Sequence, residues 1–319
     1  MDHPKLITVF GGDGFVGTQI VQLLARAGHR VRVAVRRPDL AGHVKPLGGV
    51  GQIVLVQANV RNADSVMAAV RGADVVINLV GIGIERGKQR FRAVNAMGAK
   101  NVAEAARIAG AGTLLHMSVL GADEHSRSTF ARSRALGEEM VRAAFPGAII
   151  FRPSIVFGNG DGFFNLLGSI ARLLPVIPLF GGATKFQPVY VGDVAEAFAA
   201  AAEGNARAGT TYELGGPEVL THRQIVERVL QETGRSNPIL PLPNFVGTLL
   251  AIPMGLLPKP LVTRDQIKLL STDNVVSAEA IREQRTLAAF GVTPRPLEAI
   301  LPSYLWRFRK HGQFDRQTA

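Results

Sequence analysis

Residues 10–17 read Phe-Gly-Gly-Asp-Gly-Phe-Val-Gly, and this loop decides the fold. It follows a short apolar run, Leu6 to Phe10, which is typical of a buried parallel strand. It precedes a stretch, Val16 to Ala27, whose apolar residues recur at helical spacing and which ends at Gly28. A glycine triplet between a strand and a helix predicts a turn that binds the pyrophosphate of a dinucleotide.

The glycines of this loop have separate physical tasks. They permit a tight turn, let a pyrophosphate approach the backbone, and let the helix pack closely on the strand. The helix N-terminus adds N–H donors and the positive end of the helix dipole. The alternative is a glycine-rich turn that binds no ligand. The loop residues predicted to contact the cofactor are Gly11, Gly12, Gly14, Phe15, Val16 and Gly17.

The alternation of strand and helix patterns continues through the first half of the chain. Apolar runs predict the strands, and helical spacing predicts the helices between them. The predicted strands are 31–35, 53–57, 74–80, 113–117 and 148–151, and the predicted helices are 63–70, 91–109 and 130–144. Repeated units of this kind predict an α/β fold with a Rossmann-type, doubly wound parallel sheet.

The second half of the chain differs from the first in composition and in the length of its predicted elements. Beyond Arg152 prolines and glycines become frequent, and shorter elements such as 211–214 and 223–233 replace the regular units. We therefore assign residues 1–152 to an NAD(P)-binding Rossmann domain and residues 153–319 to a smaller C-terminal α+β lobe. We expect the two parts to interleave in one compact unit.

The end of the second predicted strand bears on which cofactor binds. An NAD site usually carries Asp or Glu there, which binds the ribose 2′-hydroxyl. This chain has Arg36 and Arg37 instead, and guanidiniums match the charge of a 2′-phosphate and bind it bidentately. The sequence therefore predicts NADP(H) in preference to NAD(H). The alternative is a pair of solvated arginines in a basic chain.

Composition excludes several kinds of site. The 319 residues are 47% hydrophobic, which is enough for a large core. The chain has no cysteine, which excludes disulfides, thiolate metal sites and cysteine nucleophiles, and we predict no metal site. The net charge of +11 favours anionic partners or indicates only a basic soluble protein, and without a nucleic-acid-binding motif we predict no nucleic-acid partner. We expect neither a signal peptide before the first strand nor a transmembrane helix.

Motifs beyond the glycine loop resemble those of the extended short-chain dehydrogenase/reductases, over roughly residues 1–230. The matching segments are Ala58-Asn59-Val60, Asn78-Leu79-Val80-Gly81, Val94-Asn95, Met117-Ser118, Arg152-Pro153-Ser154-Ile155-Val156-Phe157-Gly158 and Val189-Tyr190-Val191-Gly192-Asp193-Val194-Ala195. The resemblance implies a cofactor site that also includes Asn59, Val60, Leu79, Val80, Gly81, Asn95, Ser118, Arg134, Pro153 and Ile155.

The same resemblance locates the family's catalytic element, a Tyr-x-x-x-Lys pair on the helix after the fifth strand. The flanking residues of this chain place Phe130 at the tyrosine position and Arg134 at the lysine position, while Ser118 keeps the third position. A phenyl ring has no ionisable proton, and a guanidinium stays protonated, although Arg134 can still bind ribose hydroxyls. The substitution argues against classical dehydrogenase activity, so we name no catalytic residue.

An active NADP-dependent reductase or epimerase is the alternative, with another residue in place of the phenol as general acid. The candidates are His125 and Ser128 in the loop before this helix, and His116 on the fifth strand. A histidine in the middle of an apolar strand is more often a packed core residue, and a loop histidine is more often solvated.

An intact nucleotide loop beside a degraded Tyr/Lys pair is similar to one subgroup: the NADPH-binding accessory subunits of respiratory complex I (NADH:ubiquinone oxidoreductase) and their relatives in ubiquinone biosynthesis. The C-terminal string from Thr263-Arg264-Asp265-Gln266 to Asp273-Asn274-Val275-Val276 also resembles this subgroup. The resemblance implies a non-catalytic accessory or assembly role with a structural NADPH. It implies partners among complex I subunits or quinone-biosynthesis proteins, and it does not separate these two.

Two segments fit docking at an anionic membrane surface. Phe245 to Leu257 is apolar but too short to span a bilayer, and the alternative is a core helix or lid. Tyr304 to His311 mixes aromatic rings with cations, and the alternative is a terminal helix that packs its rings inward. With the family resemblance, these segments predict a peripheral protein on the cytoplasmic side of a bacterial inner membrane.

Overall fold

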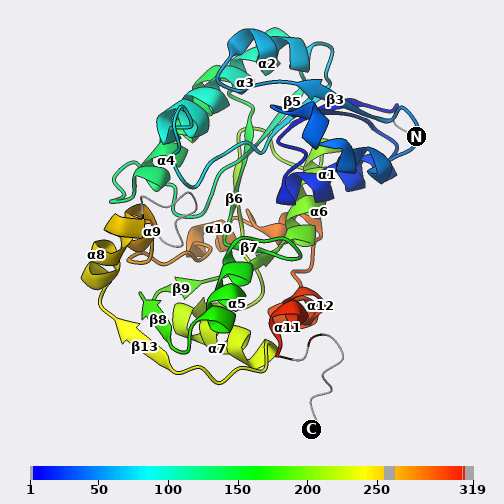
Figure 1. The fold of residues 1–319 in the computed structure, drawn as a ribbon. Helices are drawn as coiled ribbons and strands as arrows, with labels where there is room; N and C mark the ends of the chain where they lie inside the picture. Colours follow the sequence, from blue (N-terminus) through cyan, green and yellow to red (C-terminus); the bar gives the residue numbers. More distant parts are fainter. Residues whose placement is uncertain (1–2, 255–262, 311, 313–319) are drawn as a thin grey trace. The chain divides into compact units, whose positions relative to one another are not determined.

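The computed structural model describes residues 3–254, 263–310 and 312, and the chain divides into two compact units (Figure 1). Unit 1 comprises Met1–Pro153, Val191–Leu214 and Ser277–Thr293. Unit 2 comprises Ser154–Tyr190, Gly215–Val276 and Pro294–Ala319. Each unit is therefore assembled from three separate stretches of the chain.

Unit 1 contains a parallel sheet in which the strand order is β11-β6-β5-β4-β1-β2-β3. The strands are β1 (Leu6–Phe10), β2 (Arg30–Val35), β3 (Ile53–Gln57), β4 (Val75–Asn78), β5 (Thr113–Met117), β6 (Ile149–Pro153) and β11 (Thr211–Leu214). The chain moves outward from β1 to β3 and then returns to β4 on the other side of β1, so the order reverses between β1 and β4. The predicted Rossmann-type, doubly wound fold is confirmed.

Helices cover both faces of this sheet (Figure 1). On one side α1 (Phe15–Arg26) packs against α6 (Val191–Ala202), and on the other α3 (Met97–Ile108) packs against α2 (Ala63–Val70) and α4 (Thr129–Ala144). Because both faces are covered, the strands are apolar almost throughout, and all four residues of β4 are buried. A single π-helical turn, Arg92–Ala96, leads into α3.

We expected Thr211–Leu214 to be one of the short elements of the C-terminal lobe, but it lies in unit 1. This segment is β11, and it pairs with β6 at the edge of the main sheet. The far side of β11 is covered by Ser277–Thr293, which contains α10 (Ala278–Arg282) and whose Phe290 ring packs 4.7 Å from the Tyr212 ring centroid. A four-residue strand whose neighbours are distant in sequence carries too little local signal to show this pairing.

Unit 2 consists of short strand pairs and helices around an aromatic core. The pairs are β7 (Val156–Phe157) with β10 (Val189–Tyr190), β8 (Ile177–Phe180) with β13 (Ile239–Leu242), and β9 (Lys185–Phe186) with β12 (Leu220–Thr221). The helices are α5 (Phe163–Leu173), α7 (His222–Glu232), α8 (Asn244–Met254), α9 (Arg264–Leu269), α11 (Leu297–Ile300) and α12 (Pro302–Leu305). Phe157, Phe164, Phe186, Tyr304 and Phe308 are buried together in this core.

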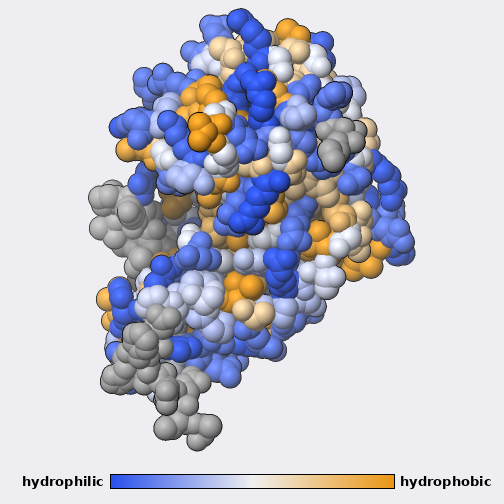
Figure 2. Space-filling view, turned by 90° about the vertical axis from the view of Figure 1, so that its right-hand side faces the viewer, coloured by the Kyte–Doolittle hydropathy of each residue, from blue (hydrophilic) through white to orange (hydrophobic). Residues whose placement is uncertain are grey.

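The two segments predicted to dock at a membrane lie in unit 2. Residues 245–254 fall in α8, where Phe245 is 72% and Leu249 65% exposed, while 255–257 lie outside the described residues. In the C-terminal segment Tyr304 and Phe308 pack inward and Arg307 is exposed, and His311 lies outside the described residues. On the face drawn in Figure 2, hydrophobic patches are separated by hydrophilic surface. None of the helices that the structure describes is long and apolar enough to span a membrane.

The closest backbone approach in the glycine loop gives a first prediction. A Cβ atom added at Gly17 would lie 2.2 Å from the carbonyl oxygen of Gly11, so Gly17→Ala must push α1 away from the loop. We expect the free energy of unfolding, measured with urea, to fall by about 2 kcal/mol. Gly42→Ala is the matched control, because nothing lies within 4 Å of the added atom. Equal losses in the two variants would contradict this explanation.

Candidate functional site

Most of the cofactor residues predicted in unit 1 gather at one edge of the sheet, because each of these groups follows the carboxyl end of a parallel strand, and Asn95 and Arg134 lie on helical segments. The glycine loop follows β1, Arg36 and Arg37 follow β2, Asn59 and Val60 follow β3, Leu79 to Gly81 follow β4, Ser118 follows β5, and Pro153 ends β6. Dinucleotides bind at this edge in doubly wound sheets, at the point where the strand order reverses. Ile155 belongs to unit 2, where its carbonyl accepts a hydrogen bond from the Val189 amide at 2.9 Å.

The glycine loop forms a tight turn under the first turn of α1. Gly11 has φ +77°, a left-handed conformation that glycine adopts without strain, and its carbonyl accepts a hydrogen bond from the Gly14 amide at 3.1 Å. Helix α1 has no side-chain cap at Gly14 and no acidic residue in its first turn. The positive end of its dipole is therefore not neutralised from within the helix, which suits an anionic ligand.

The two arginines after β2 have different surroundings. Both are exposed, but the Arg37 guanidinium pairs with the Asp39 carboxylate at 2.8 Å, and this hydrogen bond raises the pKa of Arg37. No ion pair joins Arg36 to another of the described residues. Arg36 is thus the guanidinium whose charge is available to a phosphate at this position.

Asn95 holds the loop after β4 against α4. It is completely buried in the π-helical turn, where its side chain accepts a hydrogen bond from the Ile82 amide at 2.9 Å and donates one to the Ile82 carbonyl at 3.1 Å. The same amide group donates to the Ser133 hydroxyl on α4 at 3.1 Å. Asn95 therefore fixes the position of Gly81 and Ile82. At the end of β3, the Asn59 side chain accepts a hydrogen bond from the Arg61 amide in a comparable local turn.

Phe130 and Arg134 lie on the first turns of α4 and contact each other. The Phe130 ring packs edge-on against Phe91 at 5.8 Å, and the Arg134 guanidinium carbon lies 5.4 Å from the Phe130 ring centroid. Arg134 also donates to the Met117 carbonyl at 3.2 Å. A Cβ at position 81 would lie 1.9 Å from an Arg134 nitrogen, so this placement depends on Gly81.

Arg134 is 6% exposed, and burial lowers its pKa to about 10, so the guanidinium remains charged at neutral pH. His116, on β5 nearby, is 1% exposed. Burial, followed by the charge of Arg134, lowers the pKa of His116 to about 4, so this imidazole is neutral. The Asn78 amide lies 3.2 Å from His116 Nδ1, and its oxygen accepts from the Val80 amide, so the amide nitrogen faces the ring. The network therefore assigns the His116 proton to Nε2.

Two buried nitrogen atoms in this region have no hydrogen-bond partner among the residues that the structure describes. They are His116 Nε2 and Arg134 Nε. Buried donors without acceptors are rare and costly, and a ligand that carries oxygen acceptors would satisfy them. The residues at this edge of the sheet therefore fit a nicotinamide dinucleotide, whose ribose hydroxyls and carboxamide are such acceptors.

The other candidates for a general acid have structural roles. The side chain of His125 is 85% exposed on the loop before α4, where it lies 3.2 Å from Glu124. Ser128 is the N-cap of α4, and its hydroxyl accepts a hydrogen bond from the Ala131 amide. His125 is therefore a surface residue and Ser128 a capping residue.

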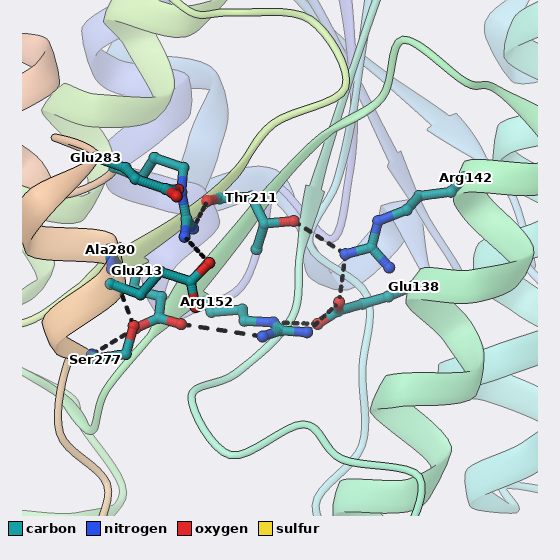
Figure 3. Close-up of polar contacts among 10 residues, drawn as sticks. Glu138, Arg142, Arg152, Thr211, Glu213, Ser277, Ala280 and Glu283 are labelled. Atoms are coloured by element: carbon teal, nitrogen blue, oxygen red, sulfur yellow. Dashed lines mark hydrogen bonds and ion pairs between the residues drawn. The ribbon is translucent and has the colours of Figure 1, made fainter.

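An ion network that was not predicted from the sequence lies next to this site (Figure 3). The Glu138 side chain on α4 is 1% exposed, and Arg152 on β6 binds its two oxygens with two hydrogen bonds of 2.8 Å. Arg142 binds Glu138 at 2.9 Å and also donates to the Thr211 hydroxyl. On its other side Arg152 lies 4.0 Å from Glu213, which accepts from the Ser277 amide. The network ties α4, β6, β11 and the segment from Ser277 together.

Some signals for this network were present in the sequence. Glu138 lies four residues after Arg134 in the predicted helix 130–144, and Arg152 opens the segment Arg152-Pro153 that matches the family. Their pairing depends on the packing of α4 on the sheet, and the network continues through Glu213 to Ser277, more than 100 positions away, which a local pattern does not contain. A cavity of about 360 Å³, lined by Asp123, Glu124, Glu138, Arg142 and Arg152 among others, opens beside the network.

The pKa of Glu138 gives a second prediction. Burial alone would raise it, but the hydrogen bonds and charge of Arg152, with a hydrogen bond from Ser118 and the charge of Arg142, hold it below the ordinary value of 4.5. The ionised carboxylate therefore stabilises the fold above about pH 4.5, and this contribution disappears as the pH falls through the lower folded value. We expect Glu138→Gln to cost about 3 kcal/mol at pH 7. In thermal melts, the gap between this variant and the unsubstituted protein should narrow towards pH 3, and a gap independent of pH would contradict the assignment.

Comparison with known proteins now identifies the family. The model of the NAD dependent epimerase/dehydratase family matches residues 7–215, which is more than half of the chain. One relative is the Arabidopsis thaliana protein named NADH dehydrogenase (ubiquinone) 1 alpha subcomplex subunit 9, mitochondrial. It is 36% identical over 319 residues, and the alignment covers 96% of this chain and 78% of the relative. The NADH-ubiquinone oxidoreductase 40 kDa subunit of Neurospora crassa is 31% identical, with 98% and 82% covered.

Solved structures support the same fold. An NADPH-dependent quinone oxidoreductase of Escherichia coli, in complex with NADPH, has a TM-score of 0.72 at 18% identity and covers 92% of this chain and 97% of its own. UDP-glucose 4-epimerase of Thermus thermophilus, in complex with NAD, has a TM-score of 0.68 at 22% identity, with 96% and 99% covered. This chain therefore belongs to the NAD dependent epimerase/dehydratase family of extended short-chain dehydrogenase/reductases, and it is similar over nearly its whole length to subunits of NADH:ubiquinone oxidoreductase.

Proposed function

We propose that this chain is a non-catalytic, NADPH-holding accessory or assembly protein of respiratory complex I, the NADH:ubiquinone oxidoreductase. The observation that carries the proposal is Phe130 at the position of the family's proton donor, packed against a buried Arg134. A phenyl ring cannot transfer a proton, and a guanidinium does not titrate near neutral pH. The nucleotide site thus keeps its binding residues without the acid that reduction of a carbonyl needs.

The nucleotide's role in this proposal is structural. His116 Nε2 and Arg134 Nε are buried without a hydrogen-bond partner among the described residues, and acceptors on a bound nucleotide would satisfy them. A ligand that binds only the folded state stabilises it by mass action. NADPH in particular is supported by Arg36, which is exposed beyond β2 and forms no ion pair with the described residues.

The proposed partner follows from the relatives. Those named as subunits of NADH dehydrogenase or NADH-ubiquinone oxidoreductase align over 95–98% of this chain, so the likeness includes unit 2 and not only the nucleotide site. Quinone-biosynthesis proteins are the other candidate partners. We place the protein peripherally on the cytoplasmic face of a bacterial inner membrane, and the exposed Phe245 and Leu249 on α8 support attachment to a lipid or protein surface.

The choice of cofactor can be tested at Arg36. We expect the unsubstituted chain to bind NADPH more tightly than NADH, and Arg36→Ser to weaken NADPH binding about tenfold, because a charge-assisted hydrogen bond to the 2′-phosphate is lost. NADH affinity should not change. Arg30→Ser, at the opposite end of β2 and also exposed, is the matched control. Calorimetric titration measures the affinity of each of the three proteins for each nucleotide, and equal affinity of the unsubstituted chain for NADH and NADPH would refute the proposed preference.

The proposed partner can be tested by purification under native conditions. We expect the full chain, extracted from membranes with mild detergent, to migrate with NADH:ubiquinone oxidoreductase and to release NADPH on denaturation. Mass spectrometry of the co-purifying proteins and of the nucleotide provides the readout. Co-purification with quinone-biosynthesis enzymes alone would transfer the proposal to that pathway. A free monomer that oxidises NADPH with carbonyl or quinone substrates would reject the accessory role.

A further inference from the structure

We propose that Arg134 makes this nucleotide site select the reduced, uncharged nicotinamide over the oxidised, cationic nicotinamide. The inference rests on the proposed nucleotide binding and adds to it a preference for one redox state. It is carried by the burial of Arg134, by the charges that surround it, and by its place at the ends of β4 and β5.

Arg134 is a buried cation without an ion pair to any carboxylate in the described part of the chain. Its side chain is enclosed by the Phe130 ring, the Met117 carbonyl and the backbone of Gly81. Only one hydrogen bond, the one to Met117, satisfies its donors within the described residues, and Nε has none. Because few solvent dipoles reach this guanidinium, its charge acts on a neighbouring group with little screening.

The groups around Arg134 compensate that charge only in part, and the one contribution of opposite sign is the charge of Glu138, which raises the pKa of Arg134. Glu138 lies one turn further along α4, but its carboxylate is bound by Arg152 and Arg142 at 2.8 and 2.9 Å. With Glu213, these ion pairs contain two guanidiniums and two carboxylates, so Arg134 is an additional positive charge beside a balanced group. His116 is neutral, so it neither adds nor removes charge. The remaining acids beside α4, Asp123, Glu124 and Glu139, are exposed, and water and salt screen them.

Phe130 cannot supply a negative charge beside Arg134. A tyrosine at this position could ionise beside a cation and supply a negative charge that offsets Arg134. The phenyl ring offers only the weakly negative face of its π-system, 5.4 Å from the guanidinium carbon. Phenylalanine in place of the family's tyrosine therefore removes the proton donor. It also removes the group at this position that could balance the buried charge of Arg134.

The fold determines which half of a dinucleotide this charge meets. The pyrophosphate loop follows β1, and Arg36, the candidate for the 2′-phosphate, follows β2, so the adenosine half belongs on the side of β2 and β3. The nicotinamide half then belongs over β4 and β5, where Gly81 and Met117 hold Arg134. An oxidised nicotinamide ring carries a positive charge and a reduced ring carries none. Like charges in a site of low dielectric repel, so the reduced form is favoured.

The experiment compares the affinities of the full chain for NADPH and NADP⁺ by calorimetry, with nucleotide-induced thermal stabilisation as a second readout. We expect NADPH to bind at least about tenfold more tightly than NADP⁺, as a charge repulsion at an effective dielectric constant near 20 implies. Arg134→Gln should bring this ratio close to one, even if it weakens both affinities. Arg134→Lys, which keeps the charge, should retain the preference. Arg132→Gln removes the same charge from an exposed position of α4 and should leave the ratio unchanged.

Two results would overturn the inference. One is equal affinity of the unsubstituted chain for the two nucleotides, a measurement that requires no variant to fold. The other is a ratio that Arg134→Gln leaves unchanged. Tight binding without redox preference would remove this inference and leave the proposed nucleotide binding intact, whereas failure to bind either nucleotide would refute both.

Discussion

The contact between the Gly11 carbonyl and the first turn of α1 is the constraint on which the site depends. A Cβ at Gly17 would lie 2.2 Å from this oxygen, so the helix can start directly over β1 only because position 17 has no side chain. This close approach places the positive end of α1 at the carboxyl edge of the sheet, beside the reversal in strand order. The predicted cofactor residues that follow β2 to β6 are placed at the same edge by those strands, whereas Asn95 and Arg134 lie on helical segments.

A second constraint is that a buried charge needs compensating partners. Helix α4 carries two buried charges whose partners differ. Glu138 is almost fully buried, and two arginines compensate its charge while the network extends to β11 and Ser277. Arg134, one turn earlier, is equally buried but has one carbonyl and one aromatic ring as partners. The first arrangement holds unit 1 together, since its members come from distant stretches of the chain. The second leaves hydrogen-bonding capacity unused, which is typical of a site built for a ligand.

The sequence alone was enough to predict the strands β1 to β6, the helices between them and the edge where the cofactor residues lie. Each of these depends on a local pattern: an apolar run, helical spacing, or a glycine after a strand. The pairing of β11 with β6 and the cover supplied by Ser277–Thr293 were not predictable, because they join segments far apart in sequence. Within the site, Phe130 and Arg134 were located by their register. That Arg134 lies against Gly81, and that the His116 proton is on Nε2, depends on packing that no single segment encodes.

The proposed role is to hold a nucleotide without turning it over. It rests on the protonation states and the unsatisfied hydrogen-bond donors of two buried side chains in this site. A catalytic site needs a group that changes protonation near neutral pH, and here Arg134 stays charged while His116 stays neutral. Burial holds each of them in one charge state near neutral pH, so neither titrates there as an ordinary general acid or base does. The same burial makes their unpaired donors costly in the absence of a ligand. A nucleotide that supplies acceptors would relieve that cost and stabilise the fold, so the features that oppose turnover are also those that favour retention of the nucleotide.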